Sequence, residues 1–319
     1  MSEYTLPFEK PISELKDKLD ELTKASEGQD IDMGQEVARI KKKIRETQKK
    51  VYSNLTPWQE VQIARHPMRP YPKDYIDGLS EGFIELHGDR LYKDDRAIIG
   101  GFGWLDDHRV MFIGTQKGRD TKSNLACNFG CAYPEGYRKA LRLMKMAAKY
   151  KVPVVSLIDT PGAYPGIESE ERHVAEAIAV NLREMSNLPV PIIAVVTGEG
   201  GSGGALGIGV GDRLFILQHA YYSVISPEGC AAILWKDRAF ADKAAGALKI
   251  SSKDLQKLNL VDGIIPEPLG GANNKPKEAM QSLKQIVLDG LKELQALSTE
   301  ELLQKRYEKL RAYGSYKEG

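Results

Sequence analysis

The sequence predicts an α/β fold, with a core of successive ββα units and helical extensions at the N- and C-terminal ends. Within residues 154–210, a strand-like run followed by a glycine-rich turn and a helical segment occurs twice. Two further strand-like runs, at residues 97–104 and 109–114, follow one another without an intervening helix. Amphipathic patterns typical of helices occupy residues 10–52 and 276–312.

The N-terminal part of the chain, residues 1–85, is predicted to be a helical extension. Apolar residues recur there at heptad-like spacing in two stretches, first Ile12, Leu15, Leu19 and Leu22, then Val37, Ile40, Ile44 and Val51. The polar segment Ala25–Gly34 between them indicates the loop of a helical hairpin with a narrow apolar seam. Lysine runs at 41–43 and 49–50 indicate a solvated face. The prolines of Arg65–Tyr71 are expected to end the helices and begin an extended segment.

The predicted core spans residues 86–270 and begins with the two paired strands, joined by the turn at Asp106–His108. A helix is expected over residues 135–150, because its apolar residues follow an i, i+3, i+4, i+7 stripe. The first strand–turn–helix unit comes next, with Val154–Ile158 as its strand and residues 168–186 as its helix.

The second unit begins with the strand Pro191–Val196 and continues into Gly198–Gly207, which contains six glycines. Further elements are expected as short strands at Leu214–Gln218, Tyr221–Ile225 and Val261–Ile265, and as short helices after Ser226 and at Asp254–Asn259. The C-terminal segment, residues 271–319, is expected to be helical, with an apolar stripe of Leu283, Ile286, Val287, Leu291 and Leu294 and a capping box at Ser298–Glu301.

Composition limits the functional classes. The 319 residues carry a formal net charge of +1, which argues against nucleic acid as a main partner. Cys127, Cys131 and Cys230 make no disulfide framework and lack the further ligands that a metal site needs, so we expect three free thiols and no metal in this chain. No apolar run approaches the ~18 residues of a membrane span, and residues 1–10 do not resemble a signal peptide. We therefore expect a soluble cytoplasmic protein.

The glycine-rich stretch at residues 196–210 fits three kinds of site. Gly198-x-Gly200-x-x-Gly203 matches a dinucleotide fingerprint, but no acidic residue ends the next strand to bind a ribose. Gly200-x-Ser202-x-Gly204 matches a hydrolase nucleophile elbow, but the only later histidine and its candidate acid, His219 and Asp212, are crowded into the adjacent strand. The third interpretation is a turn whose backbone N–H groups hold an oxyanion at a helix start.

The oxyanion interpretation needs only amides without obstructing side chains, which this stretch provides, while ordinary close packing of glycines is the alternative. The turn Asp159–Gly166 supports the oxyanion interpretation. Two prolines and two glycines shape that turn, and the acidic residues at 168–171 suit the positive end of the following helix. Two such units side by side would form a pocket lined by amides, although each could also be an ordinary strand–helix connection.

Seven motifs carry a resemblance to a known family, namely Ala64–Tyr71, Gln116–Lys122, Pro134–Met144, Ile158–Gly166, Gly198–Leu206, Tyr222–Ala231 and Ile265–Ala272. Through these motifs, and over essentially its whole length, the chain resembles the alpha subunits of bacterial acetyl-CoA carboxylase carboxyltransferases. The resemblance implies a crotonase-like spiral of ββα units. It also implies transfer of a carboxyl group from carboxybiotin, held on the biotin carboxyl carrier protein, to acetyl-CoA. The product would be malonyl-CoA, at the first committed step of fatty acid biosynthesis.

The resemblance further implies partners and site residues. A beta subunit would complete an α2β2 enzyme and supply a zinc ribbon, and biotin carboxylase would act in the full complex. Gly203 and Gly204 would donate their backbone N–H groups to the biotin oxyanion. Gly162, Ala163 and Ser202 would line the same pocket, with no nucleophilic role for Ser202. Arg119 and Lys122 would meet phosphate or carboxylate, or lie in a solvated loop.

Two other functions remain open from the sequence. A crotonase-like scaffold subunit without catalysis would bind a partner only, and it would have no need of amides free of side chains. An acyl-CoA hydratase would work without biotin and would need a carboxylate base in the site. His173 lies close in sequence to the turn Asp159–Gly166, but a surface or core role is the expected one.

Overall fold

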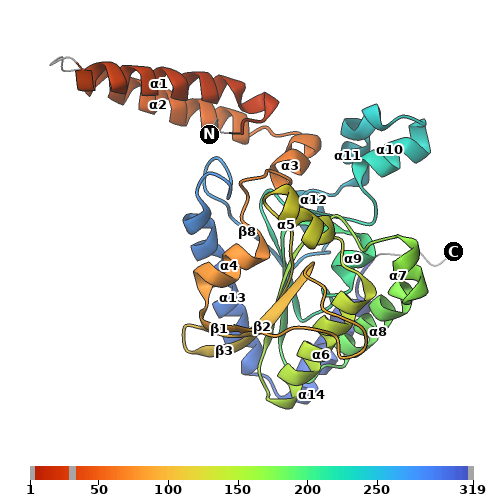
Figure 1. Cartoon of the computed structure of the whole chain (residues 1–319). Coiled ribbons are helices and arrows are strands. Elements are labelled where there is room, and N and C mark those ends of the chain that lie inside the picture. Colours follow the sequence, from red (N-terminus) through yellow and green to blue (C-terminus); the bar gives the residue numbers. More distant parts are fainter. Residues whose placement is uncertain (1–3, 29–33, 315–319) are drawn as a thin grey trace.

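A mixed sheet of eight strands forms the centre of the computed structural model, which describes residues 4–28 and 34–314 (Figure 1). Its path runs β1-β2-β3-β4-β5-β6-β8, and β7 pairs with β5 off this path. The strands are β1 (Glu81–Glu85), β2 (Ile98–Leu105), β3 (His108–Thr115), β4 (Val154–Thr160), β5 (Ile192–Gly201), β6 (Arg213–Leu217), β7 (Tyr221–Ser223) and β8 (Gly263–Ile265).

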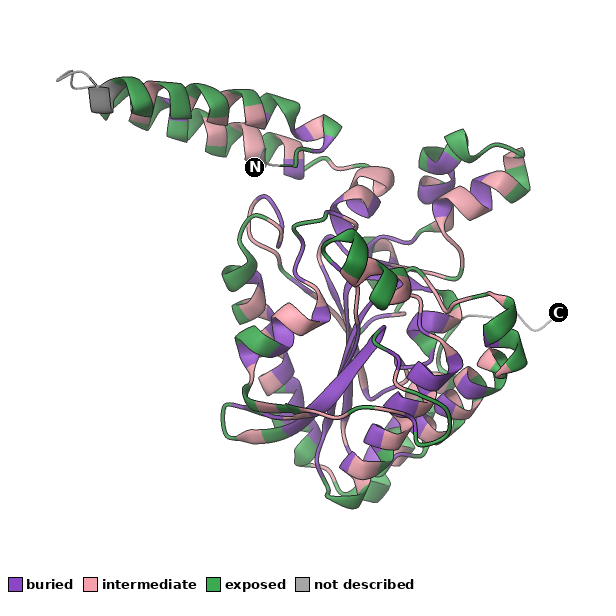
Figure 2. Cartoon of the chain, in the orientation of Figure 1, coloured by how far each residue is buried: buried purple, intermediate pink, exposed green. Residues whose placement is uncertain are grey.

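The sheet changes from antiparallel to parallel at β3. Strands β1, β2 and β3 form an antiparallel meander, whereas β3, β4, β5, β6 and β8 run parallel to their neighbours. Every residue of β4 and β5 is buried, which explains why these strands read as continuous apolar runs rather than alternating ones. Figure 2 shows this buried centre surrounded by helices with one exposed face.

Helices cover both faces of the sheet. On one face, α6 (Pro134–Lys149) packs against α8 (Val174–Ser186), and Leu143 of α6 lies over Gly100 of β2. On the other face, α4 (Pro72–Leu79) packs against α13 (Pro276–Gln295), and Ser80 lies over Gly103 of the same strand. Gly100 and Gly103 point to opposite faces because successive residues of a strand alternate.

The predicted N-terminal hairpin is confirmed as α1 (Lys10–Gly28) and α2 (Gly34–Tyr52), which project from the core (Figure 1). The lysine runs on α2 are exposed, as expected of a solvated face. The loop expected between the helices falls largely on residues 29–33, and these lie outside the described residues, as do 1–3 and 315–319. Tyr52 ties the hairpin to the core, since its hydroxyl donates to Glu9 Oε1 at 2.5 Å and contacts the Gly270 carbonyl at 3.1 Å.

Three local expectations are wrong. The helix expected over residues 168–186 is two helices, α7 (Ile167–Glu171) and α8, because His173 between them has a left-handed φ of 63°. The extended segment expected after Arg65–Tyr71 is instead interrupted by α4. Strand β1 also belongs to the sheet although it precedes residue 86, where the core was expected to begin.

The remaining predicted elements are present with shifted ends. The helices not yet placed are α3 (Pro57–Ala64), α5 (Thr121–Ala126), α9 (Ser202–Leu206), α10 (Pro227–Trp235), α11 (Ala241–Leu248), α12 (Ser252–Lys257) and α14 (Thr299–Arg311), with 3-10 turns at Pro7–Glu9, Asn128–Gly130 and Arg238–Phe240. Ser226 caps α10 and Ser298 caps α14, as their sequences predict. Within the described residues, no helix combines the length and apolar character that crossing a membrane requires.

Candidate functional site

The two glycine-rich segments meet at the C-terminal ends of β4 and β5. Strand β5 continues through the glycines to Gly201, so the helix start predicted within this stretch lies at Ser202, the first residue of α9. A Cβ atom on Gly204 would lie 2.4 Å from the carbonyl carbon of Gly162 and 2.5 Å from the amide nitrogen of Ala163. Only glycine at position 204 lets the two backbone segments come this close, because real Cβ atoms do not make contacts that short.

The backbone amides at this junction differ in availability. Gly203 and Gly204 lie in the first turn of α9, where N–H groups have no acceptor within the helix. The Gly162 amide instead donates to Thr160 Oγ1 at 3.1 Å. Within residues 4–28 and 34–314, the Ala163 amide has no hydrogen-bond acceptor. Gly203, Gly204 and Ala163 therefore offer free donors on two adjoining segments, and Gly162 does not.

Ser202 is exposed at the start of α9 with a left-handed φ of 47°. The hydrolase grouping considered for it is not assembled. Asp212 binds Arg306 through both carboxylate oxygens, at 2.8 and 2.7 Å, and accepts from the Ile192 amide. His219 is buried against Tyr52, with ring centroids 5.7 Å apart, and burial lowers its pKa to about 4.

Arg119 and Lys122 lie on the loop and helix that follow β3, and they do not converge with the glycine segments. The Arg119 guanidinium stacks 4.3 Å over the Tyr71 ring, donates to the Pro67 carbonyl at 2.7 Å and pairs with Asp74. Lys122 is exposed on α5. Arg119 thus holds the chain that enters α4.

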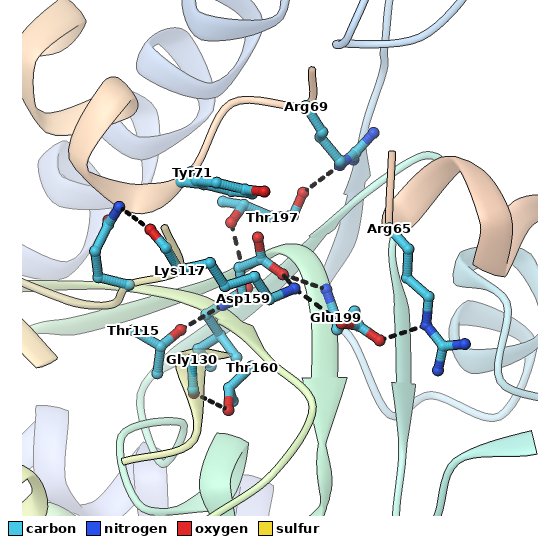
Figure 3. Close-up of polar contacts among 12 residues, drawn as sticks. Arg65, Arg69, Tyr71, Thr115, Lys117, Gly130, Asp159, Thr160, Thr197 and Glu199 are labelled. Atoms are coloured by element: carbon cyan, nitrogen blue, oxygen red, sulfur yellow. Dashed lines mark hydrogen bonds and ion pairs between the residues drawn. The ribbon is translucent and has the colours of Figure 1, made fainter. Parts of the chain in front are cut away.

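A buried group of charges beside the glycine segments escaped the sequence analysis (Figure 3). Lys117 Nζ lies 2.6 Å from Asp159 Oδ1 and 2.8 Å from Glu199 Oε2, and so bridges the ends of β4 and β5. Burial alone would lower the pKa of Lys117, but the two carboxylates raise it above its ordinary value. Lys117 is therefore held as a cation.

Arg65 extends this group toward β7 and α10. Its Nε donates to Glu199 Oε1 at 2.6 Å, and its terminal nitrogens contact Glu228 and the Tyr221 hydroxyl. Burial by itself would raise the pKa of Glu199, but the charges of Lys117 and Arg65 lower it to about 2. Glu199 is accordingly a fixed anion rather than a proton acceptor at neutral pH.

A second buried ion pair, Arg69 with Glu267, lies on the other side of β5. The two side chains are fully buried and joined by two hydrogen bonds of 2.9 and 2.6 Å, and Arg69 also donates to the Thr197 carbonyl at 2.8 Å. Burial would raise the pKa of Glu267, but Arg69 lowers it to about 2. This pair anchors β5 before its glycines begin.

The sequence did contain a signal for these charges. Arg65, Arg69, Lys117, Asp159, Glu199, Glu228 and Glu267 all lie inside the motifs that carry the family resemblance. A charged residue embedded in a glycine- or proline-rich motif beside an apolar strand is a candidate for a buried pair. The motifs did not indicate which charges pair with which.

Across the described part of the chain, no cluster of three or more His, Cys, Asp or Glu side chains has the geometry to hold a metal ion. Cys127, Cys131 and Cys230 are free thiols.

Comparison with known proteins places these features in a family. Residues 5–314 match the family model described as acetyl co-enzyme A carboxylase carboxyltransferase-like. The chain is 54% identical over 313 residues to the acetyl-coenzyme A carboxylase carboxyl transferase subunit alpha of Methylococcus capsulatus, covering 98% of each chain. It is 55% identical over 317 residues to the subunit of that name from Sodalis glossinidius, covering 98% of this chain and 99% of the other.

Solved structures share the fold at low sequence identity. A transcarboxylase 12S structure aligns with a TM-score of 0.54 at 20% identity, over 67% of this chain and 41% of that chain. A Pseudomonas malonate decarboxylase hetero-tetramer in complex with coenzyme A aligns with a TM-score of 0.56 at 15% identity, over 67% and 85%. The predicted crotonase-like fold is thereby confirmed. The chain belongs to the family of acetyl-CoA carboxylase carboxyltransferase alpha subunits.

Proposed function

We propose that this chain transfers the carboxyl group of carboxybiotin, carried on a biotin carboxyl carrier protein, to acetyl-CoA, giving malonyl-CoA. The observation that carries the proposal is the junction of two glycine-rich segments with the free amides of Gly203, Gly204 and Ala163. Family membership supports the choice of substrates. We also propose that the protein acts in the cytoplasm.

The amides of the junction account for the chemistry as electrostatic stabilisation. Carboxyl transfer develops negative charge on the ureido oxygen of the biotin ring. Gly203 and Gly204 would donate to that oxygen from the start of α9, and Ala163 would donate from the facing segment. A donor of this kind is typically worth ~3 kcal/mol of barrier. The absence of a side chain at Gly203 leaves room for the ring, whereas at Gly204 it leaves room for the facing backbone of Gly162 and Ala163.

The charges near the junction argue against the hydratase alternative. A hydratase needs a carboxylate that is free to exchange a proton. Asp159 and Glu199 are bound by Lys117, and the pKa of Glu199 is lowered to about 2. Neither carboxylate is disposed to act as a base. A scaffold without catalysis, in turn, would not need free amides at a junction of two segments.

We further propose that a beta subunit completes the site in an α2β2 assembly and carries the zinc ribbon, and that biotin carboxylase joins the full complex. Two negatively charged species form in the reaction, on biotin and on the acyl group, and each needs its own donors. The junction of the two glycine-rich segments provides one such set. The second would come from the beta subunit.

Reconstitution tests the proposed function. The purified chain alone, supplied with acetyl-CoA and carboxybiotin, should form no malonyl-CoA, and activity should appear when the zinc-ribbon partner is added. Malonyl-CoA decarboxylation should depend on biotin in the same complex. Robust turnover by the isolated chain, or by the complex without biotin, would overturn the assignment.

A further inference from the structure

The pairing of β4 with β5 is irregular just where the two strands deliver the glycine segments. Ile158 pairs with Val196, but the next registered pair is Thr160 with Gly200. Two steps along β4 therefore match four steps along β5. Irregularities of this kind bend a strand and re-aim the residues beyond the bend, and they are common next to active sites. Here they set where α9 begins relative to Ala163.

Side chains fill the gap in the ladder. Asp159 Oδ1 accepts the Glu199 amide at 2.9 Å, replacing a backbone acceptor. Thr197 Oγ1 contacts the Ile158 carbonyl at 3.2 Å. A Cβ atom on Gly198 would lie 2.6 Å from the same Asp159 oxygen. Gly198 thus leaves room for a carboxylate, a role different from that of the later glycines.

Two cations serve three carboxylates at this irregularity. Lys117 pairs with Asp159 and Glu199, and Arg65 pairs with Glu199 and Glu228. The Asp159 side chain is 1% exposed and the Lys117 side chain 12% exposed. Asp159 Oδ2 has no hydrogen-bond partner among the residues described, so Lys117 is the side chain that directly compensates this carboxylate.

We propose that Lys117 and Asp159 are positioning residues for carboxyl transfer, fixing the offset between β4 and β5 that brings the amides of Gly203 and Gly204 into line with Ala163. The inference rests on the proposed function and deepens it. Asp159 precedes Ala163 by four residues and Glu199 precedes Gly203 by four, and a single ammonium group holds both carboxylates. Removing that group leaves two buried carboxylates facing each other.

The experiment compares three variants in the reconstituted complex. Lys117→Met leaves one uncompensated buried anion, and kcat at about pH 8 should fall about 10²-fold, the effect of an ångström-scale misplacement. The KM for acetyl-CoA should stay within about twofold of wild type, because a positioning role alters the alignment of the amides and not the binding of that substrate. Lys117→Met/Asp159→Asn removes one charge of each sign and keeps an oxygen for the Glu199 amide. It should recover kcat to within about tenfold of wild type.

A pH profile separates positioning from simple destabilisation. Among the described residues, the charged or titratable groups around the two carboxylates are Arg65, Arg69, Lys117, Tyr71, Tyr75, Cys131 and Tyr221, and Glu228 is bound to Arg65. Burial raises the pKa of the tyrosines and of Cys131, and the arginines stay charged. In Lys117→Met, uptake of a proton by one carboxylate should restore part of the activity at about pH 6. Neither wild type nor the double variant should show this recovery of activity at about pH 6.

Lys139→Met is the matched control. Lys139 is more deeply buried than Lys117 and bridges Asp94 and the Asp95 carbonyl, away from the glycine segments. It should lower the melting temperature and leave kcat of the folded complex unchanged. Wild-type kcat in Lys117→Met, or a folded double variant as impaired as the single one, would overturn the inference. If Lys117→Met does not fold, the double variant alone decides, since it must fold and turn over.

The two proposals fail in different ways. A wild-type complex without biotin-dependent transfer would refute the proposed function. Hydrogen exchange of the amides at residues 200–206 would then still test the positioning role. Exchange should be faster in Lys117→Met and near the wild-type rate in the double variant. Unchanged exchange in Lys117→Met refutes the positioning role whether or not the enzyme is active.

Discussion

Gly203 and Gly204 are neighbours in the chain, yet their missing side chains face different surroundings. A Cβ atom on Gly203 would meet only the flexible end of Ile178, at 3.4 Å. On Gly204 it would strike the backbone of Gly162 and Ala163. Gly203 is therefore free of steric demand from the fold, and a substitution there reports on the site. Gly204 serves both the site and the packing of the two segments.

Gly203→Val should fold and assemble, and it should lose about 10²–10³ in carboxyl transfer, the cost of losing an oxyanion donor. Gly204→Val should lose activity and also about 1–3 kcal/mol of stability, because the two segments must separate. Thermal unfolding together with malonyl-CoA formation distinguishes the two variants. A folded Gly203→Val enzyme with near wild-type turnover would show that the donors lie elsewhere.

Ser202→Ala should keep most of its activity, because the two candidate partners of its hydroxyl are engaged elsewhere, Asp212 with Arg306 and His219 against Tyr52. The wild-type protein should not react with a serine-directed fluorophosphonate, as measured by intact mass. Gly203→Val serves as the inactive reference in the same assay. Stoichiometric labelling of Ser202 would revive the hydrolase interpretation.

At the scale of the element, α3 is a well-capped helix that buries a carboxyl group with little compensation. Thr56 and Gln59 form a reciprocal capping box, and Pro57 occupies the first helical position. The helix then buries Glu60, whose nearest cation is Lys253 at 3.8 Å and whose Oε2 has no partner in the described residues. Burial raises the pKa of Glu60 to about 7.

The raised pKa predicts a pH-dependent stability. Between the unfolded pKa and about 7 the folded protein binds a proton that the unfolded chain lacks, so stability falls as the pH rises through this window. Glu60→Gln should remove that fall and be more stable than wild type by about 2 kcal/mol at about pH 8. Denaturant unfolding at several pH values measures this. The exposed Glu46→Gln should show no such difference, and equal slopes for Glu60→Gln and wild type would contradict the explanation.

At the scale of the whole molecule, the C-terminal helices are part of the core as well as candidates for subunit contact. The buried face of α13, with Leu283, Val287, Leu291 and Leu294, joins the main apolar cluster. Arg306 of α14 is 1% exposed and bonds Asp212 and the carbonyls of Met185, Leu188 and Val190. The boundary proposed at residue 271 therefore marks a change of composition, and the segment after it still packs on the sheet.

Arg306→Met should destabilise the chain by about 3–5 kcal/mol, because Asp212 and three carbonyls lose their partner inside the protein. The activity of the molecules that remain folded should be unchanged, since Arg306 itself bonds Asp212 and the three carbonyls and no residue of the glycine segments. Arg311→Met, on an exposed position of the same helix, is the control. A melting temperature equal to wild type for Arg306→Met would mean that α14 is not anchored in solution.

Much of the fold was predictable because hydrophobic periodicity is local. The stripe over residues 135–150 predicted α6 within one residue at each end, and the apolar run at 154–158 predicted β4. Prediction failed where one residue's conformation decides the outcome. The left-handed φ of His173 splits a helix that its apolar pattern would continue. Histidine is enriched among non-glycine residues at positive φ, but most histidines do not adopt it, so the residue type alone does not predict the break.

The sequence by itself determined the order of the elements and the glycine positions that a site of free amides requires. The tertiary structure decided which amides are free. The Gly162 amide, for example, is not free because it donates to Thr160 Oγ1. It also decided the pairing of charges, since Lys117 and Asp159 are 42 residues apart and Arg65 and Glu199 are 134 apart. Charge pairing over such separations depends on the register of the strands. Register depends on the packing of the whole sheet, which no local pattern contains.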